Sequence, residues 1–292
     1  MLSESVIKEL SKKLGEPNWL LDRRIHAFKK FQELEMPSFK YGIGIFVDVS
    51  ALDINKINPL NEVKRIISNN EVEILTFSEA VNKHEDLLKN YFMSTIQISN
   101  KLTALHASFF NNGLVIIIPE NKEITKPISI NLDLTSQSQL DHILVIAGKN
   151  SKATIVETSK SNGMNGQLFR SQVVEVVVKE NAYLEYITVQ NFAKSVYNFS
   201  QRKAKVMENG FMYWIDCSIG SKFTQSLTLT KLEGVGARSK SLGVVFGDET
   251  QCYDINSETE HAASKTVSDM LTRVVLNDKA KTVYRGLVKI NP

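Results

Sequence analysis

The sequence contains few cysteines: Cys217 and Cys252 are the only two among 292 residues. Two cysteines this far apart cannot build the disulfide framework of a small secreted domain, and their spacing matches no metal motif. The N-terminal segment also lacks the apolar stretch of a secretory signal peptide. We therefore expect a protein of a reducing compartment, the cytoplasm.

Long apolar runs and an excess of charge of one sign are missing as well. No window approaches the roughly 18 apolar residues that span a bilayer, so we expect no membrane association. The 35 Lys and Arg residues nearly balance the 32 Asp and Glu residues, which leaves a net charge of +3. Because nucleic-acid binding depends on clustered basic residues, we expect no nucleic-acid partner.

Sequence motifs of catalysis are also absent. The chain has no P-loop, no HExxH zinc motif, no CxxC pair and no GxSxG nucleophile elbow. We therefore expect a protein that is not an enzyme.

The first part of the chain, residues 1–112, is mostly helical in pattern. Apolar residues recur with helical spacing over 3–14 and again over 17–34. Gly15 can end the first helix and Pro17 can begin the second, because proline lacks only an N–H that would be unpaired there. The pattern predicts a helical hairpin.

Further elements follow within the same part. Thr76 and Glu79 form a capping-box pattern, and Asn100 can cap another helix. Residues 41–49 alternate between apolar and other residues, which predicts a strand.

From residue 113 to residue 292 the sequence consists of short Val- and Ile-rich runs without helices between them, which is typical of all-β proteins. A polar turn followed by a small residue recurs there. A repeat of this length that contains strands but no helix predicts a β-solenoid with stacked coils, and a β-sandwich is the alternative. The small residues are spaced by 29, 28 and 27 positions, with a longer gap before the last: Ala153, Ala182, Gly210, Ala237 and Ala280.

The segment 258–290 carries two conflicting signals. Val267, Leu271 and Val274 belong to a set of apolar residues with helical spacing. The abundance of Thr and Val favours a strand, because β-branched side chains fit a pleated sheet. The residues alone leave both structures open.

Several segments resemble the SufB/SufD family, the scaffold proteins of the SUF iron–sulfur cluster assembly system. The resemblance implies an N-terminal helical region followed by a right-handed parallel β-helix, so that the chain is mainly β and 258–290 forms strands. The most specific match is YRGLVKI, Tyr284–Ile290. The other matching segments follow in the family's order: Gly15–Pro17 with Trp19, Arg24, Ala27, Phe31 and Met36-Pro37; Leu102–Pro119; Val173–Val176; and Val189–Asn191.

The resemblance also implies a function and partners. Members of this family are non-catalytic scaffold subunits that work with a SufC-like ATPase, and a SufB-like and a SufD-like subunit pair through their β-helices. A transient iron–sulfur cluster would then be carried by the full complex. The alternative function is a β-helix polysaccharide lyase or hydrolase, which would need clustered carboxylates or a metal ion.

The chain departs from the family pattern in two respects. It ends at Pro292, where members continue with more β-helix and a helical domain that carries the SufC contact, so we expect a truncated product, a fragment, or a half completed by another chain. The unpaired strand edges of such a chain predict self-association. SufB-like members also have a cysteine near the position of Thr230, and its absence, together with Glu260 and His261, favours a SufD-like subtype.

Candidate ligands for iron or a cluster are few. Cys252 lies in a polar turn, where we expect it to be exposed and able to take a persulfide or bind iron. Glu260 and His261 offer oxygen and nitrogen ligands, and a solvated strand end is the alternative for both. Cys217 has apolar neighbours, which predicts an inert core thiol.

The resemblance also concerns a pair of adjacent basic residues. Arg202 and Lys203 match a family position at which a basic side chain points into the β-helix. A buried cation requires a partner, and the sequence does not identify one. Outward, solvated charges are the alternative for this pair.

Overall fold

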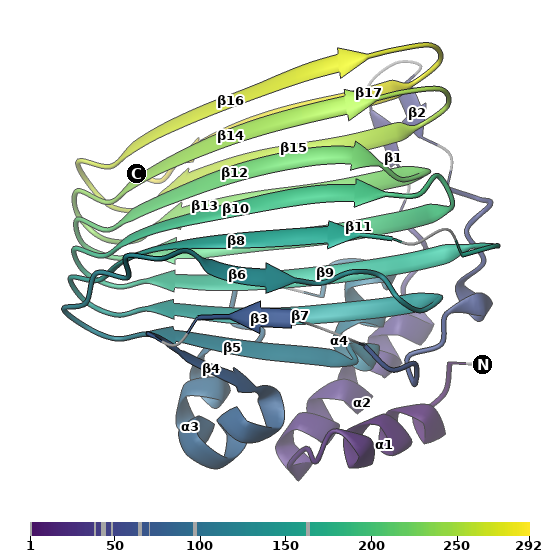
Figure 1. The fold of residues 1–292 in the computed structure, drawn as a ribbon, viewed down its shortest axis with the longest axis horizontal. Coiled ribbons are helices and arrows are strands. Elements are labelled where there is room, and N and C mark those ends of the chain that lie inside the picture. Colours follow the sequence, from purple (N-terminus) through teal and green to yellow (C-terminus); the bar gives the residue numbers. More distant parts are fainter. Residues whose placement is uncertain are drawn as a thin grey trace.

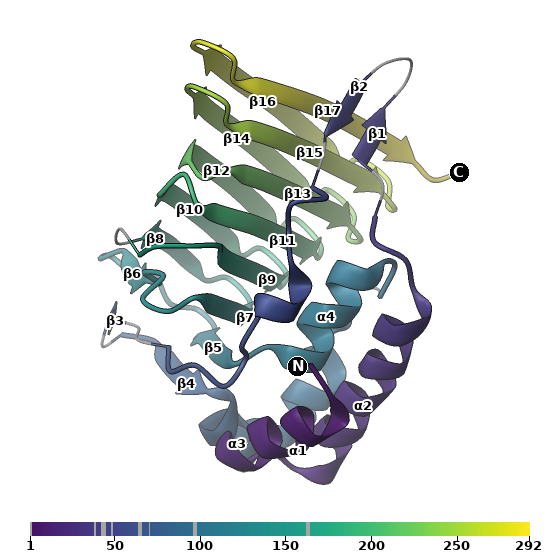
Figure 2. The same ribbon diagram turned by 90° about the vertical axis from the view of Figure 1, so that its right-hand side faces the viewer.

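Two parallel sheets form the body of the molecule, and the described helices lie at its base (Figure 1, Figure 2). The computed structural model describes residues 2–37, 39–41, 45–47, 49–63, 66–69, 71–95, 98–161 and 164–292. Successive strands from β5 onward alternate between the two sheets, so the chain winds into a parallel β-solenoid of about six turns. The β-solenoid prediction is confirmed, and the sandwich alternative is wrong.

The predicted helical hairpin is present. Helix α1 spans Glu4–Lys13 and helix α2 spans Asn18–Glu33. Gly15 ends α1 with a φ of +63°, a left-handed conformation that glycine adopts without steric cost. Arg24 fixes the hairpin from inside, because it forms a bidentate pair with Glu16 at 2.6 and 2.7 Å.

Both predicted caps are also confirmed. Helix α3 spans Phe77–Tyr91 and helix α4 spans Lys101–Phe109. Thr76 and Asn100 each accept a hydrogen bond from the third backbone N–H of their helix, in complete capping boxes. The short 3₁₀ helix η1, Ile54–Lys56, lies between the two helical pairs in the sequence.

The single strand predicted over 41–49 does not form. Instead Phe39–Tyr41 (β1) and Ile45–Val47 (β2) pair antiparallel. Residues 42–44 and 48 lie outside the described part.

The strands of the solenoid fall into two sheets. Here sheet B denotes β16-β14-β12-β10-β8-β6-β3 and sheet C denotes β17-β15-β13-β11-β9-β7-β5-β4, in spatial order. Every strand from β7 onward contains 9 to 11 residues, which gives coils of nearly equal width. The bounds are Ile66–Ser68 (β3), Glu73–Thr76 (β4), Asn112–Ile118 (β5), Ile128–Asn131 (β6), Ser138–Ala147 (β7), Lys152–Lys160 (β8), Leu168–Val178 (β9), Tyr183–Phe192 (β10), Val196–Val206 (β11), Phe211–Gly220 (β12), Phe223–Leu232 (β13), Arg238–Gly247 (β14), Cys252–His261 (β15), Val267–Leu276 (β16) and Lys281–Ile290 (β17).

The first strands close the base of the solenoid. β3 pairs antiparallel with β6, and β4 pairs antiparallel with β5, whereas the pairs above them are parallel. The N-terminal part therefore contributes one strand to each sheet. A domain boundary between residues 112 and 113 stays a prediction.

An asparagine ladder explains the repeat at one corner. The Nδ2 group of Asn181 donates to Oδ1 of Asn150 at 3.0 Å, and Asn150 donates in turn to Asn121 at 2.7 Å. Asn209 continues the ladder to Asn181 at 3.3 Å, and each of these residues has a φ between 53° and 58°. Asparagine tolerates this left-handed conformation better than most residues.

The structure corrects two members of the predicted repeat. Ala153 pairs with Leu184 inside the strands, so Ser151 is the residue of its coil that corresponds to Ala182. Ala280 follows the turn between β16 and β17, which is the opposite corner of the coil. This displacement by half a coil accounts for the longer gap that precedes it.

The conflict over 258–290 is resolved in favour of strands. β16 pairs in parallel with β14 along its whole length. Its helical spacing of apolar residues arises because both faces of the strand carry apolar side chains. Met270 and Val274 alternate with Leu271 and Val275, and a strand with two apolar faces imitates a helical pattern.

Candidate functional site

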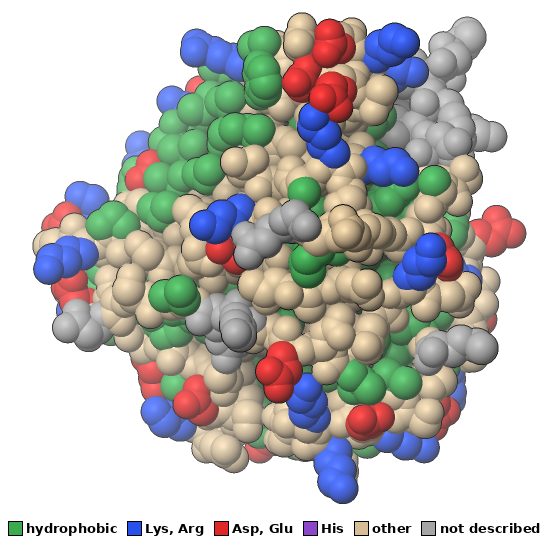
Figure 3. All heavy atoms as spheres, turned by 45° about the vertical axis from the view of Figure 1, so that its right-hand side comes forward, with side chains coloured by type: hydrophobic (Ala, Val, Ile, Leu, Met, Phe, Trp, Pro, Cys, Tyr) green, Lys and Arg blue, Asp and Glu red, His purple; other side chains and the backbone are tan. Residues whose placement is uncertain are grey.

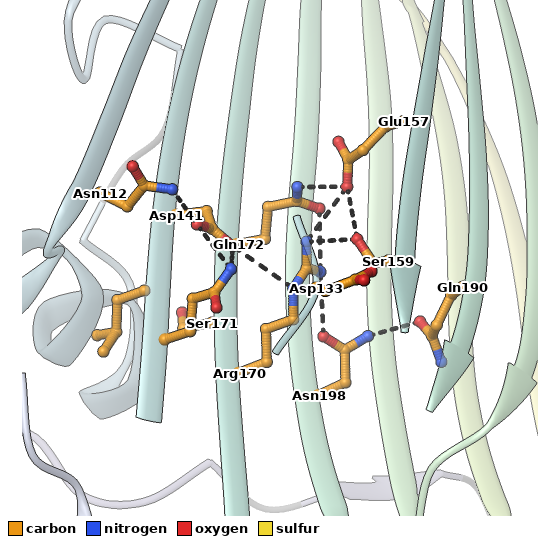
Figure 4. A network of polar contacts seen from close by, with 12 residues as sticks. Asn112, Asp133, Asp141, Glu157, Ser159, Arg170, Ser171, Gln172, Gln190 and Asn198 are labelled. Atoms are coloured by element: carbon orange, nitrogen blue, oxygen red, sulfur yellow. Dashed lines mark hydrogen bonds and ion pairs between the residues drawn. The ribbon is translucent and has the colours of Figure 1, made fainter. Parts of the chain in front are cut away.

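The interior of the solenoid is apolar on one side and polar on the other. Near the asparagine ladder the inward side chains form a hydrophobic cluster that includes Val176, Leu184 and Trp214. Farther along the same strands the inward side chains are charged or polar, and they form a network of contacts between the two sheets (Figure 4). A polar interior of this extent is compatible with folding because its side chains are paired with one another, although Oε1 of Gln139 and Nε of Arg170 and of Arg202 accept or donate no hydrogen bond within the described part.

Arg170 lies at the centre of this network. Its guanidinium is 3.2 Å from Glu157 and 3.5 Å from Asp141, and all three side chains are almost fully buried. Gln172 and Tyr186 donate to the two oxygens of Glu157 at 2.7 and 2.8 Å. Burial raises the pKa of Asp141, although Arg170 opposes this rise.

A second buried pair identifies the partner of Arg202. Its Nη2 group lies 2.9 Å from Oδ1 of Asp216 and donates to Ser226 at 2.8 Å. The neighbouring Lys203 is half-buried on the outer face of the sheet, because successive side chains of a strand point to opposite faces. The expectation of one inward basic side chain therefore applies to Arg202.

The voids between these polar side chains are small. One void beside Arg170 has a volume of about 10 Å³ and one beside Asp216 has a volume of about 20 Å³. A single water molecule needs roughly 10–15 Å³ of such volume. Each void therefore has room for about one water molecule, and neither can hold an iron–sulfur cluster in this conformation.

A buried histidine pair joins the helices to the outer face of sheet C. His106 on α4 approaches His142 on β7 at 3.3 Å, and Nε2 of His142 lies 3.0 Å from Glu175 on β9. Thr95 also donates to Glu175, from its backbone N–H at 2.9 Å and from its hydroxyl at 2.7 Å. Ser171 completes the network with a contact to His106 at 2.9 Å.

Burial dominates the protonation of this pair. It lowers the pKa of His142 and lowers that of His106 well below the ordinary value, so both imidazoles are neutral. Burial alone would raise the pKa of Glu175, but the hydrogen bonds from His142 and Thr95 lower it overall. Glu175 is therefore an ionised carboxylate that accepts hydrogen bonds from neutral donors. Its hydrogen bonds with Thr95 attach the segment after α3 to sheet C.

The structure does not bring the predicted cluster ligands together. Cys252 and His261 are the two ends of β15, and nine steps of about 3.3 Å place them roughly 30 Å apart. Glu260 points to the opposite face from His261, where Asn291 and then Lys289 lower its pKa through hydrogen bonds. His261 contacts Thr266 at 2.8 Å and Ser268 at 2.9 Å, so both of its ring nitrogens are engaged.

The two cysteines differ from their expected environments. Cys252 is half-buried and packs against the hydrophobic cluster beneath the helices, and Cys217 is half-buried on the outer face of sheet B rather than in the core. Strand alternation explains this, because the inward position of Trp214 turns Cys217 outward. Burial raises the pKa of both thiols, which keeps them protonated.

Part of the outer face of sheet B is apolar and is covered by no described helix, although the outward Lys240, Asp269 and Arg273 make other parts of it charged. Figure 3 shows hydrophobic side chains gathered at the upper left, over the later strands of this sheet. We call this surface the B face. Aligned residues of β10, β12, β14 and β16 form it in register: Ile187, Val189, Ile215, Cys217, Ile219, Leu242, Val244, Phe246, Leu271 and Val275.

The B face was missed at the level of sequence, although its signal is present. Ile215, Cys217 and Ile219 alternate with Asp216 and Ser218, which point into the solenoid, so β12 is a strand of a parallel sheet with apolar side chains on its outer face. Strands of this kind are normally covered on both sides. Val244 is nevertheless 40% exposed and Phe246 is 44% exposed.

Within the described ranges, no three His, Cys, Asp or Glu side chains are grouped as they would be around a metal ion. In the same ranges no helix is long and apolar enough to cross a membrane. The fold and its surfaces thus define a β-solenoid with a polar, closely filled interior and one uncovered apolar face.

Comparison with known proteins identifies the family. Residues 130–292 match the family model for the SUF system FeS cluster assembly, SufBD core domain, and residues 53–130 match that for the SufBD protein N-terminal region. The chain belongs to the SufBD family of iron–sulfur cluster assembly proteins.

Curated relatives agree with this assignment. The Iron-sulfur cluster assembly SufBD family proteins of Staphylococcus saprophyticus and Staphylococcus epidermidis are each 27% identical to the chain. In both, the alignment covers 98% of this chain and 71% of the relative. A corresponding protein of Staphylococcus aureus shows the same identity and coverage.

Proposed function

We propose that the chain is a non-catalytic scaffold subunit of a SUF complex in the cytoplasm. The observation that carries this proposal is the match of two SufBD family models, which together span residues 53–292. A scaffold role accords with buried charges that are paired with one another rather than directed into a cleft. This function replaces the sugar-acting alternative, which lacks any support from the family comparison.

The B face is the proposed contact with a SufB/SufD-like partner. Four strands about 4.8 Å apart and four residue steps of about 3.3 Å give the patch sides of roughly 15 Å. An area of this size is common on monomers, so the alignment of apolar residues across four strands, rather than the area, supports a contact. Because the B face is formed by neighbouring strands, the surface we propose as its complement is another sheet face, such as that of a second β-solenoid.

We propose that iron binding by this chain requires ligands from a second chain. Cys252 cannot share a cluster with Glu260 or His261, because β15 separates the cysteine from both. We infer that Glu260 or His261 would bind iron only together with ligands from a partner subunit. Cys252 would take a persulfide only by exchange with a donor's persulfide, which leaves the donor as a thiol, and only once its half-buried, protonated thiol became exposed. The iron–sulfur cluster is then transient cargo of the complex.

Two further features of the complex belong to the same proposal. A SufC-like ATPase is the expected energy-supplying partner, since the family works within the SUF system. The threonine at position 230, which accepts a hydrogen bond from Trp214 at 3.0 Å, supports the SufD-like subtype because no thiol occupies this place.

Without a partner, the chain is expected to self-associate through the edges of β16 and β17.

Anaerobic reconstitution with iron and sulfide tests this function. The chain is mixed with a SufB-like subunit and a SufC-like ATPase, and cluster formation is followed by visible absorbance. We expect the absorbance to rise faster and further with the chain than without it. A complex that neither includes the chain nor changes its cluster formation would contradict the scaffold role.

A further inference from the structure

A basic groove on the outer face of sheet C has no role in the proposed function. It is a cavity of about 350 Å³ between the outward side chains of β11, β13 and β15 and the segment that follows α3. The groove lies on the opposite sheet from the B face. The side chains that matter for its charge are Lys203, Lys205, Lys231, Glu233 and Glu260.

Two lysines lie side by side in this groove. Lys205 of β11 is the register partner of Lys231 of β13, and adjacent strands lie only about 4.8 Å apart. Like charges in directly opposite positions destabilise a sheet. Lys231 is compensated by Glu233 at 3.0 Å, whereas Lys205 forms no ion pair among the described residues.

Lys203 adds a second uncompensated ammonium group. It is half-buried, and burial lowers its pKa although Glu258 and Glu175 oppose this change. Both of these carboxylates already have other partners: Glu175 binds His142 and Thr95, and Glu258 accepts a hydrogen bond from Asn256 at 2.5 Å. No carboxylate of the described part lies in ion-pair contact with Lys203.

We propose that this groove binds a small tetrahedral oxyanion, a phosphate group, between Lys203 and Lys205. The two side chains emerge from the same face of β11 two residues apart, about 7 Å, so one anion placed between them can contact both ammonium groups. The basic residues of the groove are lysines, which bind phosphate as point charges. Ser94 at the rim supplies a hydroxyl donor.

The bound anion also explains why the lysines are placed in this way. It would neutralise the repulsion between Lys205 and Lys231 and would partner the half-buried Lys203. A cavity of about 350 Å³ is larger than a bare phosphate ion, so a phosphorylated small molecule fits as well as inorganic phosphate. Both ligands would present the same group to the same lysines.

Isothermal titration and thermal unfolding of the full chain test the proposal. Inorganic phosphate and glycerol 3-phosphate are added at an ionic strength held constant with NaCl, and acetate serves as the carboxylate comparison. We expect a saturable rise in Tm with phosphate, and a Kd at least tenfold weaker in Lys203→Gln and in Lys205→Gln. Lys126→Gln, an exposed lysine elsewhere, should bind as the unaltered chain does.

A second readout separates binding from folding. Without phosphate, Lys205→Gln should unfold at the same or a higher temperature than the unaltered chain, because it removes a repulsion.

Tighter binding of glycerol 3-phosphate would identify an organic phosphate as the ligand, and equal or weaker binding would identify the free ion. A response no larger than that to NaCl, an equal response to acetate, or unchanged affinity in both lysine variants would overturn the proposal.

Discussion

At the scale of single residues, a buried charge holds the N-terminal helices together. Arg24 is fully buried, pairs with Glu16, and donates to the backbone oxygen of Ser108 on α4 at 3.0 Å. Its guanidinium also lies 3.5 Å from the ring centroid of Phe110. The sequence identified Arg24 only through resemblance, since its burial depends on residues 84 positions away.

Removing Arg24 should therefore be costly. In Arg24→Met, Glu16 is left as a buried charge without its partner, and we expect a loss of about 3–5 kcal/mol in the free energy of unfolding. The exposed pair Lys30–Glu33 provides the control, because Lys30→Gln should not change stability measurably. Urea denaturation measures both variants, and equal effects would contradict the structural role of Arg24.

The buried histidines predict a dependence of stability on pH. The folded-state pKa values of His106 and His142 lie below the unfolded value near 6.5, so unfolding takes up protons as the pH falls through that value. The free energy of unfolding should therefore decrease below about pH 6.5, by at most about 1.4 kcal/mol per pH unit for each histidine.

The slope of the free energy of unfolding against pH is measured by urea denaturation between pH 5.5 and pH 7.5. His106→Gln and His142→Gln should each reduce it, whereas His26→Gln should leave it unchanged because His26 is exposed on α2. A stability that stays constant over this range in the unaltered chain would show that the pair is not neutral in the fold.

At the scale of elements, features that depend on neighbouring residues were predicted from the sequence, whereas features that depend on tertiary contacts were not. The capping boxes at Thr76 and Asn100 and the glycine that ends α1 depend on neighbouring residues alone, and all three are present. By residue pattern alone the strand at 267–276 could not be distinguished from a helix, because the uncovered B face keeps apolar side chains on its outer side; the family resemblance predicted a strand, and this is confirmed. Only its pairing with β14 decides the structure.

The corner of the coil gives an element-scale prediction. Asn181 has a φ of 55° and bridges Asn150 and Asn209. Asn181→Ala should lower the free energy of unfolding by about 1–2 kcal/mol, since a β-carbon is disfavoured in this conformation. Asn181→Gly removes the same ladder bonds without the backbone strain, so its loss should be smaller.

Thermal and urea unfolding of Asn181→Ala and Asn181→Gly compare the contribution of the ladder hydrogen bonds with that of the backbone conformation. If both variants lose the same stability, the ladder hydrogen bonds rather than the backbone conformation determine the residue at this corner. If neither variant loses any, the account of the repeat is wrong.

At the scale of the whole molecule, the period of the sequence predicted the solenoid, but not its surfaces. Stacking of coils 27 to 29 residues long can be inferred from turn residues such as Ala182, Gly210 and Ala237. Which side of each strand meets solvent depends on where the helices pack, and they cover part of sheet C and leave sheet B open (Figure 2). The candidate ligands Cys252 and His261 are nine positions apart in the sequence, and an extended strand separates them in the structure.

Binding of a SufB/SufD-like partner to the B face is the central claim, and a pair of valine variants tests it most directly. Val244 is 40% exposed in the B face, and Val235 is 46% exposed in a turn outside it. The affinity of the partner subunit is measured by isothermal titration for Val244→Asp and for Val235→Asp, after circular dichroism has shown that both are folded. The account predicts that Val244→Asp weakens binding at least tenfold while Val235→Asp binds as the unaltered chain does. Equal affinity of both variants and the unaltered chain would contradict it.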